Sequence, residues 1–490
     1  MYCVGVRREG SLLRSAAAIA MAAATSCTPA SAPAPSRPRV TVDAGALAGR
    51  VDSVSNALVF EGIPYAAPPV GALRWREPQP VSPWQGVRVA DRLGHNCMQH
   101  QPYGDIRADA AGKSEDCLYV NVWTPALSGR RAVMVWIHGG GFFAGFGGEE
   151  RHNPGPLTRK GVVVVTLNYR LGAFGFLAHP ALAADAPSHA SGNYGLLDQI
   201  AALRWVQRNI ERFGGDPSRV TIFGESAGAM SVGSLVGSPL ARGLFHRAIL
   251  ESGTGTVLVQ TRAGADSTAA RLASALGLSP GDDTAARLRM IPADSVLSAS
   301  VRLGPNPQTS VFWPIVDGYV LPRPVDSAIV SGQANVVPII VGSNRDESQD
   351  FFAAPSRSLA RLVRARGVPA YLYLYTRVGD DSVSRRLGAY HSSEITFVFG
   401  RSQPLAAIAG HTSYDARLAD AMSDYWVAFA TTGDPNGAPA AGKWPRWPTY
   451  DASTDAYMEL GAEIVARTAL QRALYDSLDA VGRSRGQIRP

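Results

Sequence analysis

The sequence predicts an α/β fold built on a central, mostly parallel sheet with helices on both faces. Short runs of β-branched and apolar residues occur at 118–123, 132–138 and 162–168, and loop residues separate them. An amphipathic helical stretch follows at 199–215 and stops at two glycines. Strands that alternate with helices are typical of a parallel sheet covered on both sides. The strand-like runs lack a clean polar alternation, as expected where both faces are buried.

The remaining elements extend this pattern along the chain. Alternating segments at 39–54 indicate an edge hairpin. The runs at 219–224, 336–341 and 371–375 predict further strands. An amphipathic helix at 468–483 could pack on the body of the protein or on a second subunit, so the sequence leaves the oligomeric state open.

The composition fits one large apolar core. The chain has 490 residues, of which 46% are hydrophobic and 18% are charged, and its formal net charge is +7. Basic residues are not clustered with aromatic ones, so we expect no nucleic-acid binding.

The N-terminus predicts export. Arginines at 7, 8 and 14 precede a short apolar stretch at 16–24, and small residues follow it. This order is typical of a secretory signal, which we assign to residues 1–27. The run ending at Cys27 loosely matches a lipoprotein cleavage site, and ordinary cleavage in the same region is the alternative. The protein is therefore expected to be periplasmic, anchored to the outer membrane or secreted.

Two segments follow the signal. Residues 28–39 are rich in Pro, Ala and Ser, which is typical of a linker. Residues 40–490 form the predicted catalytic domain.

A candidate nucleophile lies at the junction of a strand and a helix. Residues 224–228 have the form G-x-S-x-G, with Ser226 at the centre. Such a serine sits on a tight, strained turn that exposes its hydroxyl, and the flanking glycines allow neighbouring backbone to approach closely. The pattern alone is weak, but the preceding strand and following helix support a serine hydrolase.

A glycine-rich loop follows another predicted strand. His138 and three glycines come directly after the apolar run 132–137. Such a loop can direct backbone N–H groups at a developing oxyanion. We expect Gly140, Gly141 and Ala227 to be the donors.

The base and the acid should follow the nucleophile in the order acid, then histidine. His246 comes too early, which leaves His391 and His411. The acid should follow the strand at 336–341, where Asp346 and Glu347 are adjacent. The residues alone favour His391 as the base and do not separate the two carboxylates.

Taken together, these motifs resemble the type B carboxylesterase and cholinesterase family, and bacterial para-nitrobenzyl esterase-like members in particular. The resemblance runs in order from about residue 40 to residue 450. The matching stretches are FEGIPYAAPPVGALRW, SEDCLYVNVW, WIHGGGFFAG, NYRLGAFGFL, NYGLLDQIAALRWVQRNIERFGGDP, VTIFGESAGA, GSNRDES and YHSSEITFVFG.

The resemblance implies an α/β-hydrolase fold and resolves the alternatives. It implies that Glu347 is the acid and His391 the base, and that Cys97 and Cys117 form a disulfide. Two reduced, buried thiols are the alternative for this pair.

The resemblance also implies an environment for the site. Glu225 resembles the family's buried accessory carboxylate, with Ser252 as its usual partner. Four aromatic residues fall where the family lines its pocket, although each could instead belong to the core: Phe312, Trp313, Phe351 and Phe352.

The chain departs from the family pattern in two places. The segment between Cys97 and Cys117 contains no tryptophan, so a choline ester is an unfavourable substrate. The insertion between Glu347 and His391 is short, which should leave a more open site or one covered differently. This insertion carries Arg357, Arg361, Arg364 and Arg366; we favour a solvated helix face over contact with an anionic substrate.

The sequence therefore predicts a serine carboxylic-ester hydrolase that works through an acyl-enzyme on a small-molecule ester, without a metal or organic cofactor. The same groups could also cleave an amide, a lactone or a carbamate. A non-catalytic binding protein is a further alternative, which the complete set of Ser, Glu, His and glycines disfavours.

Overall fold

The computed structural model describes residues 37–100, 111–257, 260–279, 281, 283–304, 311–380, 382–401 and 413–484. The proposed signal, Cys27 and His411 lie outside the described residues. One compact unit begins at Arg37.

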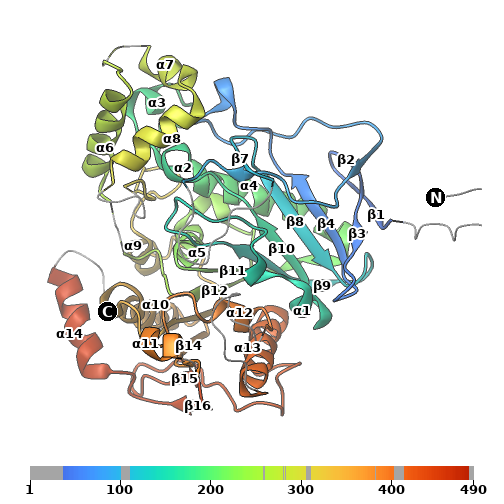
Figure 1. Ribbon diagram of the computed structural model, residues 1–490. Coiled ribbons are helices and arrows are strands. Elements are labelled where there is room, and N and C mark those ends of the chain that lie inside the picture. Colours follow the sequence, from blue (N-terminus) through green and yellow to red (C-terminus); the bar gives the residue numbers. More distant parts are fainter. Residues whose placement is uncertain are drawn as a thin grey trace, which may run out of the picture. The chain divides into compact units, whose positions relative to one another are not determined.

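Eleven strands of the described chain form one twisted sheet (Figure 1). From β10 to β15 all neighbouring strands pair in parallel, whereas β8, β4, β3 and β16 are antiparallel additions at the two edges. This is the α/β-hydrolase fold that the sequence predicts. The order across the sheet is β16 (Ile464–Arg467), β15 (Tyr457–Leu460), β14 (Ala370–Tyr375), β13 (Ile339–Asn344), β12 (Arg247–Glu251), β11 (Gly215–Glu225), β9 (Arg131–Ile137), β10 (Val163–Leu167), β8 (Tyr119–Thr124), β4 (Leu58–Pro64) and β3 (Arg50–Val51).

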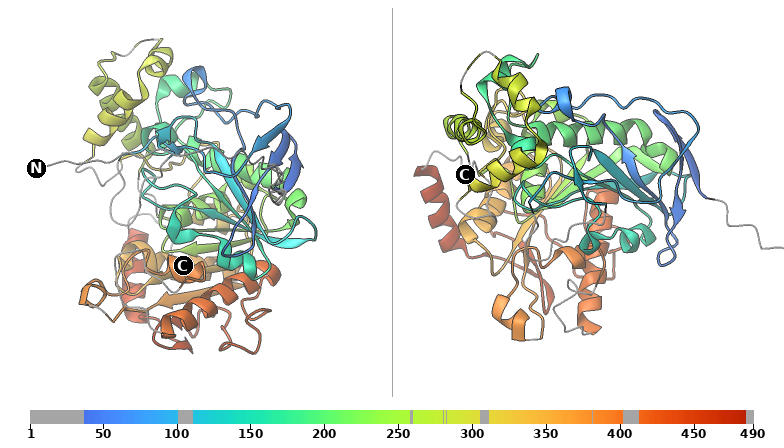
Figure 2. Two further views of the ribbon diagram at one scale, coloured as in Figure 1. Left: turned by 45° about the vertical axis from the view of Figure 1, so that its right-hand side comes forward. Right: turned by 45° about the horizontal axis from the view of Figure 1, so that its top comes forward.

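Helices cover both faces of the sheet, because alternate residues of each central strand enter different cores. On β9, Val133 and Val135 join one apolar cluster, which includes residues of α4 (Tyr194–Asn209) and α5 (Ala227–Gly237). Met134 and Trp136 join the other cluster, which includes residues of α13 (Ser413–Thr432). The right view of Figure 2 shows the green helices and the orange α13 on opposite sides of the sheet.

The predicted edge hairpin is present, but it does not extend the main sheet. Strands β1 (Arg39–Val42) and β2 (Gly45–Ala48) pair antiparallel, and β5 (Val87–Val89) joins them in a separate small sheet. Because β1 begins at Arg39, the last residue of the predicted linker belongs to a strand.

Three helices gather at one end of the sheet, where Figure 1 also shows α2 (Gly172–Phe176) and α3 (Pro180–Ala184). They are α6 (Arg262–Ala275), α7 (Thr284–Met290) and α8 (Ala293–Arg302). Earlier in the chain, Cys97 and Cys117 form a disulfide, as the resemblance implied.

The short insertion after β13 consists of η5 (Gln349–Ala353), α10 (Ala354–Ala365), β14 and α11 (Ser382–Leu387). The C-terminal α14 (Arg472–Ser484) packs against α10, so the predicted amphipathic helix contacts the body of its own chain. Further short helices are α1 (Gly155–Arg159), α9 (Val325–Val330) and α12 (Ile395–Val398).

The expectation of a solvated arginine face on α10 is wrong for Arg357. Its side chain is fully buried and forms ion pairs with Asp455 at 2.9 Å and with Asp476 at 2.7 Å. Asp479 of α14 lies 3.4 Å away. The guanidinium therefore links α10 to α14 and to the segment before β15. It is buried among these partners and does not face a substrate.

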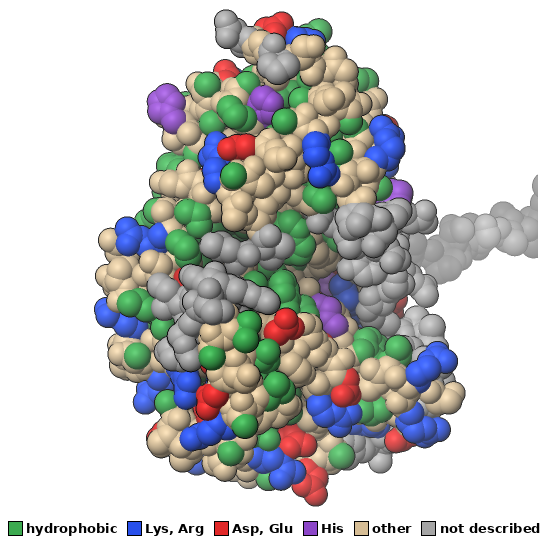
Figure 3. All heavy atoms as spheres, turned by 90° about the vertical axis from the view of Figure 1, so that its left-hand side faces the viewer, with side chains coloured by type: hydrophobic (Ala, Val, Ile, Leu, Met, Phe, Trp, Pro, Cys, Tyr) green, Lys and Arg blue, Asp and Glu red, His purple; other side chains and the backbone are tan. Residues whose placement is uncertain are grey.

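The described helices include none that is both long and apolar enough to cross a membrane. On the face drawn in Figure 3, Lys and Arg side chains are interspersed with Asp and Glu side chains.

Replacing Arg357 should destabilise the fold. Arg357→Ala removes a buried countercharge from Asp455 and Asp479, although Arg472 still pairs with Asp455 at 2.8 Å, so we expect a loss of about 3 kcal/mol. The midpoint of denaturant unfolding measures it. The matched control is Arg366→Ala, on an exposed residue just after the same helix, which should change stability by less than about 0.5 kcal/mol. Equal shifts in the two variants would contradict the role of Arg357.

Candidate active site

Ser226 lies on a strained turn between β11 and α5. Its backbone has φ 56° and ψ −123°, a left-handed conformation that is unfavourable for a residue with a side chain. Two hydrogen bonds hold the turn: the Ser226 N–H donates to the Glu251 carbonyl at 2.8 Å, and the Met230 N–H donates to the Ser226 carbonyl at 2.9 Å. The turn is therefore anchored by β12 on one side and by the first turn of α5 on the other.

The two glycines that flank Ser226 allow the end of β9 to approach closely. A Cβ on Gly224 would lie 2.5 Å from the Ile137 carbonyl oxygen, and one on Gly228 would lie 2.0 Å from the same atom. Both distances are shorter than any real contact, so no larger residue fits at either position without a backbone shift. This close approach is the physical basis of the G-x-S-x-G spacing in this chain.

Three residues that are distant in the sequence form one hydrogen-bonded line. His391 Nε2 lies 2.9 Å from Ser226 Oγ, and His391 Nδ1 lies 2.6 Å from Glu347 Oε2. Glu347 Oε1 in turn accepts from the Asn344 N–H at 2.9 Å. Ser226 follows β11 and Glu347 follows β13, so both come from the carboxyl ends of parallel strands, where sites of such sheets form.

The other candidates for acid and base lie away from Ser226 or form hydrogen bonds and ion pairs with other residues. Asp346 pairs with Arg345 at 2.6 Å and accepts from the Ala389 N–H at 2.7 Å. His246 Nδ1 accepts from the Val220 N–H at 3.2 Å, at the opposite end of the strands from Ser226. His391 and Glu347 are thus the pair that the described structure brings to Ser226.

The glycine loop after β9 adjoins the Ser226 turn. A Cβ on Gly139 would lie 2.7 Å from the Glu225 carbonyl oxygen and 3.2 Å from Ser226 Cβ. Gly140 and Gly141 have φ 97° and 61°, which glycine alone adopts readily. The Gly140 carbonyl accepts from the N–H groups of Phe143 and Ala144 at 3.1 and 3.0 Å, which fixes the orientation of these peptides. Ala227 begins α5, so its N–H belongs to a helix N-terminus.

Glu225 is buried beneath His391, but its hydroxyl partner is not the expected one. Glu225 Oε1 lies 3.2 Å from His391 Nε2 and accepts from Ser392 Oγ at 2.6 Å. The expectation that Ser252 partners Glu225 is wrong, because the Ser252 hydroxyl has no hydrogen-bond partner among the described residues. The backbone of Ser392 is left-handed, with φ 73°, and this residue carries its hydroxyl to the carboxylate instead.

Buried carboxylates surround the imidazole. Burial lowers the pKa of His391, but the negative charges of Glu225 and Glu347 outweigh burial, so the net shift is upward. Glu394 is also fully buried and accepts from the Asn344 side-chain amide at 2.5 Å; burial and the charges of Glu225 and Glu347 raise its pKa. The arrangement favours the positively charged imidazolium.

Aromatic side chains lie beside His391 and beside the glycine loop. Phe352 stacks on the His391 ring at 4.6 Å between centroids, and Phe351 meets Phe352 edge-on at 4.8 Å. Trp313 contacts Phe142 of the glycine loop at 5.5 Å. Phe312 is buried and lines a small apolar cavity beside this loop.

Sequence reasoning missed three polar residues around the site. Asn344 links the Glu347 carboxylate to Glu394, and Ser392 holds Glu225. Ser392 and Glu394 directly follow His391, within a stretch that already matched the family, and this proximity was the signal for them. No cluster of three or more His, Cys, Asp or Glu side chains suited to a metal occurs in the described part of the chain.

The fold and this arrangement define the class of protein: a serine hydrolase with the α/β-hydrolase fold. Comparisons with known proteins then give the family. The model of the carboxylesterase family matches residues 36–353 and 348–477. The chain therefore belongs to the carboxylesterase family and is a carboxylic-ester hydrolase.

Individual relatives agree with this assignment. The fumonisin B1 esterase of Sphingopyxis macrogoltabida is 36% identical over 478 residues, covering 85% of this chain and 86% of the relative. The para-nitrobenzyl esterase of Bacillus subtilis is 34% identical over 459 residues, covering 83% and 91%. A crystal structure of a Geobacillus stearothermophilus carboxylesterase superimposes with a TM-score of 0.80 at 33% identity, covering 90% of this chain and 100% of that one.

The charge of Glu225 should set the pH dependence of the site. A general base must be neutral, so kcat/KM should fall as the pH drops below the pKa of His391. Because Glu225 raises this pKa, Glu225→Gln should move the acidic limb to lower pH by about 1 unit or more. Profiles of kcat/KM against pH measure the shift. Glu211→Gln, on the surface, is the control, and an unmoved or upward-moved limb in Glu225→Gln would contradict the account.

Proposed function

We propose that Ser226, His391 and Glu347 are the catalytic triad with which this carboxylic-ester hydrolase works. The observation that carries the proposal is the unbroken hydrogen-bonded line from Ser226 Oγ through both ring nitrogens of His391 to Glu347. The chain order Ser, acid, His is the order expected for this fold.

In the acylation step, His391 Nε2 takes the proton of Ser226 Oγ as the oxygen attacks the ester carbonyl carbon. Glu347 fixes the ring tautomer through Nδ1 and stabilises the imidazolium that forms. The buried charge of Glu225, 3.2 Å from Nε2, adds to this stabilisation. The imidazolium then protonates the alkoxide leaving group, which departs as the alcohol.

We propose that the N–H groups of Gly140, Gly141 and Ala227 bind the oxyanion of the tetrahedral intermediate. The contact between Gly139 and the Ser226 turn supports this role, because it keeps the loop beside the nucleophile. A single donor of this kind contributes about 3–4 kcal/mol to lowering the barrier. In deacylation, water repeats the sequence on the acyl-enzyme, with His391 again as base and then as acid.

The aromatic residues suggest where the two halves of the ester lie. Trp313 and Phe312 adjoin the glycine loop, so we assign them to the acyl side. Phe352 covers the imidazole and Phe351 packs on it, so we assign this pair to the leaving-alcohol side. An apolar acyl group fits this lining best.

We also propose that the protein is exported through the signal at 1–27. The disulfide between Cys97 and Cys117 supports this, because such bonds persist in oxidising compartments.

Removing the nucleophile should abolish turnover. Ser226→Ala is expected to reduce kcat on a simple aryl ester by about 10⁴–10⁶-fold, because only the oxyanion donors and binding remain. Initial rates measured with para-nitrophenyl acetate provide the test. Retention of wild-type hydrolysis would rule out Ser226 as the nucleophile.

The two adjacent carboxylates should differ sharply. Glu347→Gln should lower kcat by about 10³-fold or more, since the amide no longer holds the imidazole as a carboxylate does. Asp346→Asn, the matched control, should lower it by less than about 10-fold. The reverse order would overturn the assignment of the acid.

A further inference from the structure

A cavity larger than the one that Phe312 lines lies among residues that take no part in the proposed mechanism. It measures about 610 Å³, within the range of small-molecule sites. It is formed by the segment 73–79, the residues that lead into α4, Arg289 near the end of α7, and the segment 317–320. None of its lining residues belongs to the triad or to the glycine loop.

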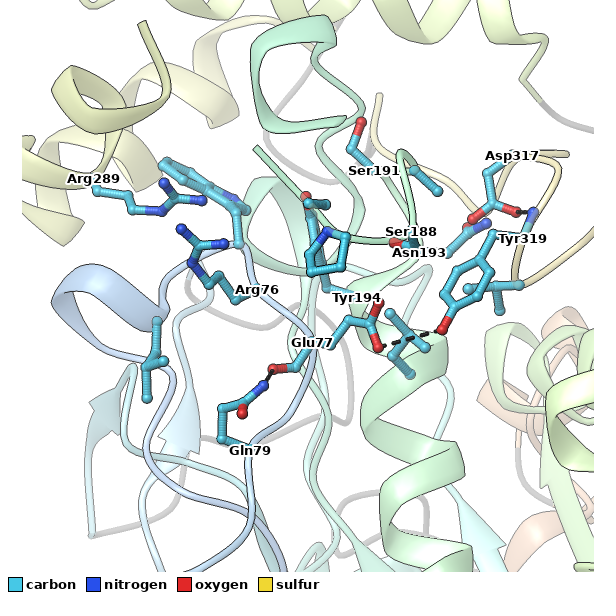
Figure 4. Close-up of a pocket in the computed structure, with 17 residues that line it drawn as sticks. Arg76, Glu77, Gln79, Ser188, Ser191, Asn193, Tyr194, Arg289, Asp317 and Tyr319 are labelled. Atoms are coloured by element: carbon cyan, nitrogen blue, oxygen red, sulfur yellow. Dashed lines mark hydrogen bonds between the residues drawn. The ribbon is translucent and has the colours of Figure 1, made fainter. Parts of the chain in front are cut away.

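One end of the cavity carries surplus positive charge. Figure 4 shows Arg76 and Arg289 on one side of the cavity and Asp317 and Tyr319 on the opposite side. Arg76 and Arg289 both pair with the single carboxylate of Asp185, at 2.9 and 2.6 Å. Two guanidinium groups therefore share one countercharge, which leaves about one positive charge to attract an anion.

The opposite end offers hydrogen-bond acceptors. Glu77 accepts from the Tyr319 hydroxyl at a long distance of 3.4 Å. Asp317 Oδ1 accepts from the backbone N–H groups of Tyr319 and Leu321 at 3.0 and 2.9 Å. A ligand group that donates hydrogen bonds suits this end.

A buried hydroxyl lies between the two ends. Tyr194 lines the cavity with only 2% of its surface exposed, and its hydroxyl has no hydrogen-bond partner among the described residues. Burial raises the pKa of this hydroxyl, whereas the charges of Arg170, Arg289 and Arg76 act to lower it. The hydroxyl thus lies in the field of the guanidinium end. A buried O–H without a partner is unfavourable, and an acceptor supplied by a ligand would satisfy it.

The wall between the ends is aromatic and apolar. Trp75 is 1% exposed, and its indole N–H already donates to the Ala173 carbonyl at 2.8 Å. Its N–H group is therefore not available to a ligand, and little of its ring is exposed. Leu73, Leu197 and Val320 complete this part of the lining.

We propose that this cavity binds a small aromatic carboxylate that carries a hydrogen-bond donor at its far end. The carboxylate accepts from Arg76, Arg289 and the Tyr194 hydroxyl. The ring packs along Leu73 and Leu197, and the distal donor reaches Glu77 or Asp317. No residue of the proposed triad or of the glycine loop lines the cavity, so we assign its occupant as a ligand other than the ester undergoing hydrolysis.

Binding of 4-hydroxyphenylacetate tests the proposal. Titration calorimetry is carried out on the full chain after an organophosphonate has blocked the esterase site. We expect saturable binding with a dissociation constant of about 1 mM or tighter. Phenylacetate lacks the distal donor and 4-hydroxyphenylacetamide lacks the charge, so both should bind more weakly. Absence of saturable binding, or equal affinity for the amide, would overturn the proposal.

Two variants locate the binding. Tyr194→Phe removes only the unpartnered hydroxyl and should weaken binding by about fivefold or more without lowering the melting temperature. Arg76→Gln should weaken it by about tenfold or more. The matched control is Arg302→Gln, on an exposed residue at the end of α8, which should leave the affinity unchanged. Unaltered binding in both cavity variants, or a cavity that holds only water, would contradict the assignment.

Discussion

The left-handed backbone of Ser226 is the constraint on which the site depends. Such a conformation costs about 1–3 kcal/mol for a non-glycine residue, so the surrounding structure must hold it. Here β11 is fixed between β9 and β12, and Gly224 and Gly228 both pack against the carbonyl oxygen of Ile137. Ile137 is the last residue of β9, from which the glycine loop departs. One strand end therefore positions both the proposed nucleophile and the proposed oxyanion donors.

The charge of the His391 imidazole depends on neighbouring carboxylates that are buried away from water. Glu225 and Glu347 are buried close to His391, and their negative charges favour the cation that would form when Ser226, the proposed nucleophile, loses its proton. Each of these carboxylates needs hydrogen-bond donors in turn. The Ser392 hydroxyl donates to Glu225, and the Asn344 backbone N–H donates to Glu347. The Asn344 side-chain amide donates to Glu394, which is buried beside them. The short polar segment after His391 thus contributes to the electrostatics of the site together with the proposed triad.

The sequence predicted the sheet well, because continuous apolar runs mark buried parallel strands whatever their neighbours are. It also predicted the strained turn at Ser226, because two nearby glycines mark where a neighbouring strand must approach closely. It did not separate Asp346 from Glu347 by chemistry, because both are carboxylates after the same strand, and only the direction of each side chain distinguishes them. Two further errors of prediction have the same cause: Ser392 and not Ser252 is the partner of Glu225, and Arg357 lies against α14 and not on a solvated face. Each depends on which segments meet in space, and no local pattern records that.

The central claim is that Ser226 forms the covalent intermediate, and mass mapping tests it directly. The protein is treated with a fluorophosphonate, digested, and its peptides are identified by tandem mass spectrometry. The account predicts one phosphonylated residue, Ser226, and complete loss of hydrolysis as labelling reaches one group per chain. A fully inactivated protein with Ser226 unmodified, or full activity with Ser226 phosphonylated, would contradict it.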